Sequence, residues 1–360
     1  MRRDADVVVV GGGITGVGTL RALSRAGLET ILLEQFELGH ARGSSYGTSR
    51  IFRLSYPDPA YTRLAQTALL AWRALEAECG ERLTVHTGSL DLGDDAADVE
   101  RSLAGLGIPF EVLSSDAATR RWPLAFEPDA RLVFQPDGGY TLADRAHAAL
   151  VASALAAGGR LLEHEQVVRI AVHSEGVTVT TPALELEARV VVVAAGAWAR
   201  DLLAPLGVEL PVVAARETVA YFSLPGAEEL PPLIEYPSPA SPLPEGQAYY
   251  ALPAPGRGLK AGIHHAGLPA DPDKEGVADT AVVEATSAWV ARRFPHADPA
   301  PLDAETCLYT NTADQSFLIE AHGRIVVASA CSGHGFKFAP VHGERVAELA
   351  RMVTGSGLLA

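Results

Sequence analysis

Apolar runs and amphipathic stretches alternate along this chain in a pattern that predicts its secondary structure. Residues 7–10 and 30–33 are largely apolar runs of strand length, as expected for buried parallel strands. Between them, leucines at a near-helical spacing predict a helix that ends at Gly27. Two later runs, 189–195 and 324–329, predict further buried strands. The pattern therefore predicts an α/β core with a buried sheet.

Four more helices follow from apolar positions at helical spacing. They are expected at residues 61–79, 144–157, 277–294 and 340–352. The first domain is therefore interrupted, because the N-terminal, middle and C-terminal parts of the chain all contribute buried strands to it. Short strands are also expected at 167–170 and 176–180.

Two segments break this regular pattern. Residues 90–139 read as a mixture of short strands and turns. Residues 225–244 contain seven prolines, which predicts neither a helix nor a central strand. We expect this second segment to be a loop system that frames the entrance to a ligand site.

The first strand runs directly into a glycine turn with the spacing GxGxxG. Gly11 permits the tight turn, Gly13 lets the backbone approach a pyrophosphate, and Gly16 lets the helix pack close to the strand. The helix N-terminus then offers unpaired amides and a partial positive charge to phosphate. Glu34 ends the second strand, where a carboxylate can accept both hydroxyls of a ribose. Together these features predict a dinucleotide site.

Composition and charge narrow the class of protein. With 360 residues and 48% hydrophobic content, the chain can form about two domains. A formal net charge of −15 argues against nucleic acid or an anionic membrane as partner. Arg2 and Arg3 lead directly into the first strand without a signal peptide, and no apolar run reaches the roughly 18 residues that span a bilayer. Three cysteines without metal-type spacing fit a reducing cytoplasm and predict no metal site.

Several segments match a known family in order and approximate spacing. They are the stretch 306–310 followed by Asp314 and Phe317, the SGHGFKF stretch at 332–338, and the segments 47–53 and 249–264. Through them the whole chain resembles the monomeric sarcosine oxidase and N-methyltryptophan oxidase family of FAD-dependent amine oxidases, which are D-amino acid oxidase-like flavoproteins. The chain departs from the family at 46–49, where Tyr-Gly-Thr-Ser replaces the usual His-Gly-Asp-Thr.

The resemblance implies an α/β fold, α+β overall, in which a Rossmann-like FAD-binding domain is interleaved with a substrate-binding domain on an antiparallel or mixed sheet. Residues 1–85, 140–212 and 303–360 would form the first domain, and 86–139 and 213–302 the second.

The resemblance also implies FAD as cofactor, attached through a thioether from Cys307 to the 8-methyl group of the flavin ring. Cys79 and Cys331 are expected to be structural. The residues expected to contact FAD are Gly11, Gly13, Ile14, Thr15, Gly16, Glu34, Gln35, Ser44, Ser45, Ser49, Arg50, Val167, Ala195, Gly196, Trp198, Cys307, Gly333, His334, Gly335, Phe336 and Lys337.

The same resemblance assigns the substrate site. Arg53 and Lys337 would bind the substrate carboxylate, because a guanidinium offers two donors and an ammonium adds a compact charge. Tyr250 is a further carboxylate contact, and His264 would lie near the amine. His265 should point to the opposite side if this stretch is a strand. Lys260 would promote the reaction with oxygen. Arg50 would be a second cation beside the flavin, and Tyr309 would also line the substrate site.

We therefore expect an oxidase that converts a small N-methyl amino acid, sarcosine first, to an imine, with formaldehyde, glycine and hydrogen peroxide as products. It would act as a cytoplasmic monomer without nucleic-acid or membrane partners. Three alternatives stay open. The substrate could be a bulkier N-methyl amino acid such as N-methyltryptophan, or a cyclic imino acid such as proline or pipecolate. The enzyme could be a dehydrogenase with another acceptor, or the chain could bind flavin or another ligand without turnover.

Overall fold

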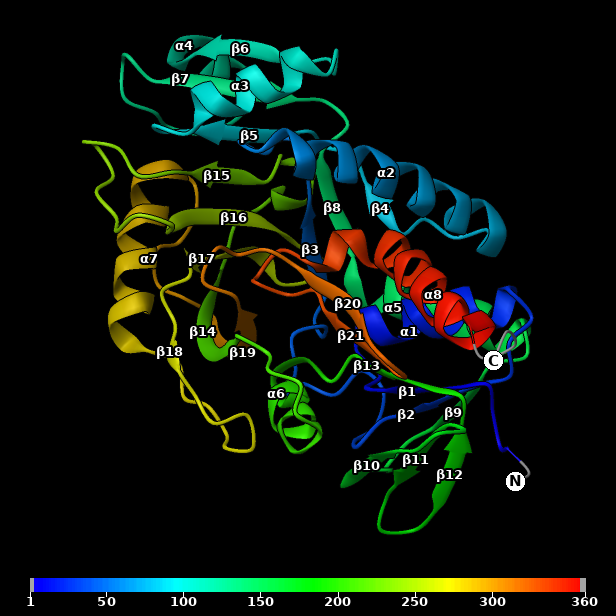
Figure 1. Cartoon of the computed structure of the whole chain (residues 1–360). Helices are drawn as coiled ribbons and strands as arrows, with labels where there is room; N and C mark the ends of the chain where they lie inside the picture. Colours follow the sequence, from blue (N-terminus) through cyan, green and yellow to red (C-terminus); the bar gives the residue numbers. More distant parts are fainter. Residues whose placement is uncertain (1–2, 357–360) are drawn as a thin grey trace.

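The computed structural model describes residues 3–356, and most of its strands belong to two large sheets (Figure 1). The smaller sheet has six strands in the order β20–β21–β13–β1–β2–β9. All neighbouring pairs are parallel except β20 with β21. The strands are β1 (Val7–Val10), β2 (Thr30–Leu33), β9 (Arg160–Leu162), β13 (Val190–Val193), β20 (Leu318–His322) and β21 (Ile325–Ser329).

Both faces of this sheet are covered, which explains why β1 consists of four valines. Val7 and Val9 belong to a core shared with helices α1, α5 and α8. Val8 and Val10 belong to a second core, formed with the antiparallel sheet β10–β11–β12 and helix α6. The alternation of a strand divides the four side chains between the two cores. These elements are α1 (Ile14–Arg25), α5 (Ala143–Ala156), α6 (Ala199–Leu203), α8 (Ala339–Ser356), β10 (Arg169–Val172), β11 (Val177–Thr180) and β12 (Glu185–Ala188).

The larger sheet has nine strands in the order β18–β14–β17–β16–β15–β5–β7–β6, with β19 also paired along β14. Helix α7 (Thr280–Arg293) covers one of its faces, where Trp289 and Phe294 pack against alternate residues of β14 and β17. The strands are β5 (Ser89–Leu92), β6 (Glu111–Ser114), β7 (Arg131–Gln135), β14 (Val213–Phe222), β15 (Leu233–Glu235), β16 (Ala248–Ala254), β17 (Gly258–His264), β18 (Leu268–Pro269) and β19 (Asp303–Asn311).

A long helix and a small sheet connect the two halves. Helix α2 (Pro59–Cys79) begins at Asp58, whose side chain accepts a hydrogen bond from the Ala60 amide, and it ends at Gly80 with φ +71°. Beside it lies the antiparallel sheet of β3 (Ser49–Phe52), β8 (Gly139–Leu142) and β4 (Thr84–Val85) (Figure 1). The described residues 3–356 also form four 3-10 helices: η1 (Gly196–Trp198), η2 (Ala204–Leu206), η3 (Ala227–Glu229) and η4 (Phe336–Phe338).

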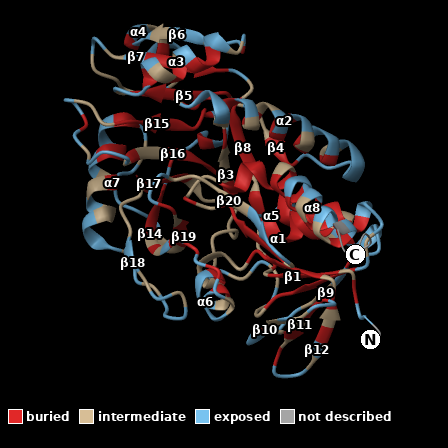
Figure 2. Ribbon diagram, in the orientation of Figure 1, coloured by how far each residue is buried: buried red, intermediate tan, exposed pale blue. Residues whose placement is uncertain are grey.

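Burial follows this layered arrangement. The strands of both large sheets are mostly buried, whereas α2, α7 and α8 expose their outer sides (Figure 2). The predicted fold class is confirmed, since the chain is a mixed α/β protein with a parallel sheet and a mixed sheet.

Two predictions about irregular segments are wrong. The proline-rich segment 225–244 contains β15, which is fully buried and pairs with both β16 and β5. Prolines stand before and after these three residues but not among them, so the backbone donors of the strand remain free to pair. The segment 90–139 contains helices as well as strands and turns, namely α3 (Ala96–Gly105) and α4 (Ser115–Arg121).

The interleaved arrangement can be followed along the chain. Strands from the N-terminus, the middle and the C-terminal part meet in the six-stranded sheet. Strand β19 begins at Asp303 and pairs with β14, so it lies in the nine-stranded sheet although the proposed boundary at 303 assigns it to the cofactor domain. The domain boundaries themselves stay a prediction.

Candidate active site

A cavity of about 1280 Å³ extends from the glycine turn after β1 to the face of the nine-stranded sheet that α7 does not cover. Residues from distant parts of the chain line it. Among the predicted site residues, all except Gly16 lie on its wall. Gly16 is behind the wall, where a Cβ atom would come within 1.9 Å of the Gly11 carbonyl oxygen. This close approach is the helix–strand contact that the motif predicts.

Groups from other elements stabilise the conformation of the turn after β1. Gly11 has φ +105°, and a Cβ atom there would lie 2.6 Å from the Ala194 carbonyl oxygen. The Ile14 amide donates to Ser45 Oγ at 3.0 Å. His147 Nε2 lies 2.8 Å from the Gly12 carbonyl oxygen, so we assign the ring proton to this nitrogen. No acidic side chain stands in the first turn of α1, which leaves its N-terminus suited to an anion.

Glu34 has backbone partners in addition to the ligand role predicted for it. Its carboxylate accepts from the Gly12 amide at 2.6 Å and from the Phe36 amide at 2.9 Å, and His40 Nε2 lies 3.5 Å away. A carboxylate can accept about four hydrogen bonds, so capacity for ribose hydroxyls remains. Glu34 therefore also fixes the turn that it helps to line.

One face of the nine-stranded sheet carries the predicted reactive groups. Tyr250 pairs with Gly262, Lys260 pairs with Tyr221, and the alternation of the strands puts their side chains on the face opposite α7. Cys307 on β19 is paired with Glu217 on β14 and faces the same way. The Tyr250 hydroxyl lies above Gly262, where a Cβ atom would come within 3.0 Å of it.

Lys260 is buried in this face without a close carboxylate partner among residues 3–356. Its ammonium lies 5.9 Å from the centre of the Tyr221 ring. Burial, together with the positive charge of Arg50, lowers the pKa of Lys260 to about 7. The sequence holds only three lysines, and two of them, Lys260 and Lys337, line the cavity.

Arg50 and Cys307 complete this end of the site. Arg50 donates to the carbonyl oxygens of Ser49 and Ser44, each at 2.8 Å, so its guanidinium organises the loop before β3 as well as facing the cavity. Burial raises the pKa of the Cys307 thiol, while the charges of Lys260 and Arg50 oppose that shift. The thiol is therefore protonated at neutral pH.

A second pair of basic side chains, Arg53 and Lys337, also lines the cavity. Arg53 donates to Asp91 Oδ1 at 2.8 Å and to the Tyr236 hydroxyl at 2.7 Å. Its guanidinium lies 4.4 Å from the centre of the Tyr56 ring, and the Lys337 ammonium lies 5.6 Å from the same ring. The structure therefore brings the predicted carboxylate ligands together.

Three histidines, His264, His334 and His342, lie near Lys337. Burial lowers the pKa of His264 well below its ordinary value, and it lowers that of His334 to about 3. Both rings are therefore neutral at physiological pH. A Cβ atom on Gly333 would meet His264 and Tyr309, so this glycine makes room for both rings.

The orientation predicted for His265 required a strand at this position, and the strand stops one residue earlier. Strand β17 ends at His264, and His265 adopts φ +58°, so the alternation expected of a strand does not apply to it. The two rings are 4.1 Å apart, and His265 also contacts Tyr309 at 5.7 Å between ring centres. A strand alternation does not hold past the last paired residue.

Comparison with known proteins places the chain in a family. The DAO family of FAD dependent oxidoreductases matches residues 6–349. Peroxisomal sarcosine oxidase of Homo sapiens is 34% identical, over 99% of this chain and 94% of that protein. N-methyl-L-tryptophan oxidase of Yersinia pestis is 31% identical, over 97% and 95%. The chain belongs to the FAD-dependent oxidoreductase family. The resemblance noted in the sequence is confirmed.

Solved structures similar to this FAD-dependent oxidoreductase agree with its fold. NikD, an amino acid oxidase essential for nikkomycin biosynthesis, has a TM-score of 0.85 at 30% identity, with 96% of this chain and 93% of NikD covered. L-proline dehydrogenase from P. horikoshii has a TM-score of 0.84 at 23% identity, with 97% and 94% covered. The second likeness shows the shared fold alone.

The cavity of this oxidoreductase fits an FAD. A Cβ atom on Gly13 would meet one atom within 4 Å, Ser45 Oγ at 3.3 Å, so the backbone at the start of α1 is open to a pyrophosphate. Glu34 lies where a ribose would reach it. At the far end, Lys260 and Arg50 supply positive charge where a flavin ring would gain electrons. These are the residues that would hold the cofactor.

The sequence missed several residues that shape the site. Asp91 and Glu217 are buried carboxyl groups near the two cation clusters, and Tyr236 contacts Arg53. His147 supports the glycine turn from α5. Only Asp91 gave a sequence signal, because it stands between Leu90 and Leu92, and an acid is rarely buried in such a stretch without a partner.

The described residues contain neither a membrane-spanning helix nor a cluster of metal ligands. Among residues 3–356, no helix combines the length and apolarity needed to cross a membrane. Over the same residues, His, Cys, Asp and Glu form no group of three or more that could hold a metal ion.

Proposed function

We propose that this oxidoreductase oxidises the secondary amine of a small N-methyl amino acid, sarcosine first, to an imine that hydrolyses to formaldehyde and glycine. The observation that carries the proposal is a cavity with room for FAD that is lined by two pairs of basic side chains. Arg53 and Lys337 form one pair, and Lys260 and Arg50 form the other. The sarcosine and N-methyltryptophan oxidases similar to this chain support the substrate class.

Bound FAD would supply a two-electron acceptor for the C–H bond beside the amine. The protein's contribution is binding and orientation. Arg53 and Lys337 would hold the substrate carboxylate, because both donors reach the same part of the cavity. Tyr250 lines the cavity near Cys307. Its hydroxyl is a further candidate contact for the substrate carboxylate.

His264 would favour binding of the substrate with its amine in the neutral form. The ring itself is uncharged, since burial and the neighbouring His265 lower its pKa. A neutral imidazole can accept a hydrogen bond from the amine without requiring the amine to be protonated. A buried ammonium without a carboxylate partner would be unfavourable in the same place.

Cys307 is the proposed attachment point of the flavin. The thiol lines the cavity and faces the same side as Lys260. Joining a thiol to a methyl group as a thioether removes two hydrogen atoms, which dioxygen would accept as oxidant. Lys260 and Arg50 favour the thiolate needed for that bond, against the effect of burial.

Oxygen is the proposed electron acceptor in turnover, and hydrogen peroxide the product. Lys260, which is 8% exposed, would stabilise the negative charge that develops on oxygen as the first electron moves to it. We also propose a cytoplasmic, monomeric enzyme. Its three cysteines are free, which agrees with a reducing compartment.

Substrate bleaching under anaerobic conditions tests the function. Sarcosine, N-methyltryptophan, proline and pipecolate are each added to the oxidised holoenzyme without oxygen, and the visible flavin band is followed. We expect sarcosine to bleach the band. A panel in which no N-methyl or cyclic imino acid bleaches it would exclude the proposal.

The bulkier substrates are a second candidate for a structural reason. Beyond Arg53, the cavity is lined by the rings of Tyr56, Tyr61 and Tyr236 and by Ile234. An aromatic or cyclic side chain would bury apolar area there that sarcosine leaves uncovered. Faster bleaching by N-methyltryptophan or pipecolate than by sarcosine would select this candidate.

A further inference from the structure

The guanidinium that would bind the substrate carboxylate already has a carboxylate partner. Asp91 is fully buried on β5, and its Oδ1 atom accepts from Arg53 at 2.8 Å and from the Tyr236 hydroxyl at 3.2 Å. Tyr236 in turn accepts from Arg53 at 2.7 Å. The three groups form a closed triangle of hydrogen bonds at the end of the cavity.

The triangle is charge-balanced before any substrate arrives. Burial opposes the charge on Arg53, yet Tyr236 and Asp91 hold its pKa above the ordinary value. Burial raises the pKa of Asp91, and the adjacent guanidinium opposes that shift. At 2.8 Å, we treat the two as an ion pair with no net charge.

Lys337 stands beside this pair without a counter-charge. It is 4% exposed, and its ammonium nitrogen donates to the His334 carbonyl oxygen at 2.8 Å. No carboxylate of residues 3–356 lies within ion-pair distance of it. Burial and the charge of Arg53 lower the pKa of Lys337 well below its ordinary value. An empty site therefore favours the uncharged amine.

A carboxylate that enters this end of the cavity would meet one net-neutral pair and one amine on which burial and the nearby Arg53 disfavour a charge. Burying an unbalanced negative charge is costly. A proton on Lys337 removes the imbalance, because the ammonium then faces the new carboxylate directly. We propose, resting on the function proposed above, that Asp91 is a positioning residue that neutralises Arg53, so that Lys337 takes up one proton when the substrate carboxylate binds.

Other titratable groups around Lys337 do not offer this proton site near neutral pH. Burial lowers the pKa of His334 and of His342 to about 3 each, and it lowers that of His264 well below the ordinary value. Tyr56 and Tyr236 have raised pKa values, chiefly because they are buried, so both stay protonated throughout. Each of these groups therefore keeps its protonation state while Lys337 changes.

Binding of acetate to the oxidised holoenzyme tests the proposal without turnover. Acetate carries the carboxylate but no amine to oxidise, and acetamide is its uncharged counterpart. The probe is the shift of the visible flavin band on titration between about pH 7 and pH 9. Uptake of one proton makes the acetate Kd rise about tenfold for each pH unit. Acetamide binding should not change with pH.

Three variants distinguish the effect of charge on acetate binding from the effect of hydrogen bonding and side-chain size. Asp91→Asn keeps the side-chain size but leaves Arg53 uncompensated, so acetate should bind without proton uptake and with a Kd independent of pH. Tyr236→Phe removes two hydrogen bonds and no charge, so binding should weaken while the tenfold dependence stays. Lys337→Met should abolish the pH dependence. Calorimetry in two buffers of different ionisation enthalpy counts the protons directly.

Two results would overturn the inference. One is an acetate Kd in the wild-type protein that does not change with pH. The other is a pH dependence in Asp91→Asn equal to that of the wild type. Either could occur while sarcosine still bleaches the flavin, and proton uptake with acetate could be found in a protein that oxidises no N-methyl amino acid. The two proposals therefore fail separately, and the wild-type and Lys337→Met results decide even if Asp91→Asn does not fold.

Discussion

Lys260 holds its ammonium where burial works against the charge. Its pKa is lowered to about 7, so the cation is present below that pH and is lost as the pH rises through it. If the cation promotes the oxygen reaction, Lys260→Met should slow reoxidation by roughly 100-fold or more, by analogy with other preorganised charges. Anaerobic bleaching by substrate should change little. Rapid-mixing measurements of the two half-reactions separate these effects.

Lys274 provides a matched control for that variant. It is exposed, pairs with Asp271 at 3.5 Å and is not among the residues that line the cavity. Lys274→Met should leave both half-reactions unchanged. In the wild type, the oxygen rate should fall as the pH rises above about 7. A Lys260→Met variant with a normal oxygen rate would remove Lys260 from the oxygen reaction.

Glu217 predicts a pH-dependent stability. It is 2% exposed; its Oε2 atom accepts from the Gly267 amide at 2.9 Å, and its Oε1 atom has no hydrogen-bond partner. Burial raises its pKa from 4.5 to about 7. A raised carboxyl pKa stabilises the fold fully below the unfolded value and loses that effect as the pH rises through the folded value.

The wild type should therefore lose about 3 kcal/mol of unfolding free energy from this group between about pH 4 and pH 8. Glu217→Gln keeps the oxygen acceptor for Gly267 and removes the charge. Denaturant unfolding of both proteins across this range measures the difference. Equal slopes with pH in the two proteins would show that Glu217 does not titrate there.

Some site residues could be predicted from the sequence, and others could not. Cys307, Arg53 and Lys337 could be predicted because each stands in a recognisable segment, and the structure brings all three to the cavity. Asp91 and Glu217 could not be assigned, because their roles depend on which strands pair with β5 and β14. A single sequence does not fix such pairings between distant strands.

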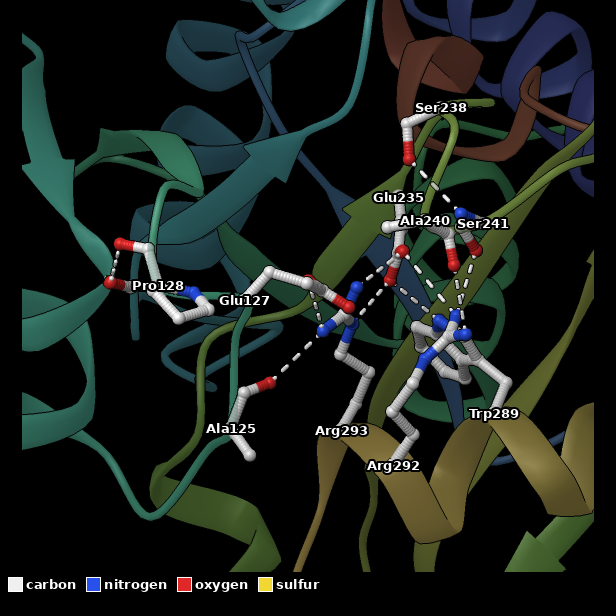
Figure 3. Close-up of polar contacts among 11 residues, drawn as sticks. Ala125, Glu127, Pro128, Glu235, Ser238, Ala240, Ser241, Trp289, Arg292 and Arg293 are labelled. Atoms are coloured by element: carbon white, nitrogen blue, oxygen red, sulfur yellow. Dashed lines mark hydrogen bonds and ion pairs between the residues drawn. The ribbon is translucent and has the colours of Figure 1, made fainter.

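At the scale of elements, β15 presents its two sides to different surroundings. Glu235 faces α7, where Arg293 Nε and Nη2 each donate to its carboxylate at 2.6 Å and Trp289 Nε1 donates at 2.7 Å (Figure 3). Ile234 and Tyr236 line the cavity on the other side. The buried ion pair thus anchors β15. Tyr236 directly follows this strand and contacts Arg53.

The adjacent residues Arg293 and Arg292 give a matched pair of variants. The Arg293 side chain is 2% exposed and Glu235 is fully buried, so Arg293→Met would leave a buried carboxylate without its main partner. The loss should be about 3–5 kcal/mol of unfolding free energy. The Arg292 side chain is 41% exposed, and its replacement by Met should cost about 1 kcal/mol or less.

Thermal or denaturant unfolding of the two arginine variants makes the comparison. Similar losses for both would contradict a dominant role for the buried pair.

The same element also shows where sequence reasoning failed, because the prolines around β15 argued against a strand and only three residues form it. By contrast, β1 was predictable because a run of valines fits a strand that is buried on both faces.

At the scale of the whole molecule, one cavity joins parts of the chain that are far apart in sequence. The glycine turn before α1 comes from the N-terminal part of the chain, β19 contributes Cys307, and the loop before η4 contributes Gly333 and His334. Figure 1 shows α1 and β19 as separate parts of the fold. The family and the parallel-sheet fold could be predicted from these segments. The route of β19 along β14 could not, since it requires the register of two long strands.

The proposed chemistry requires FAD to lie in this cavity with Cys307 bonded to it. The most direct measurement is the intact mass of the denatured protein, compared between the wild type and Cys307→Ala. We predict that the wild type carries an FAD-sized increment that survives denaturation and that the variant lacks it, while native Cys307→Ala still binds FAD reversibly. A wild-type mass equal to that of the bare polypeptide, or an increment that persists in Cys307→Ala, would contradict the account.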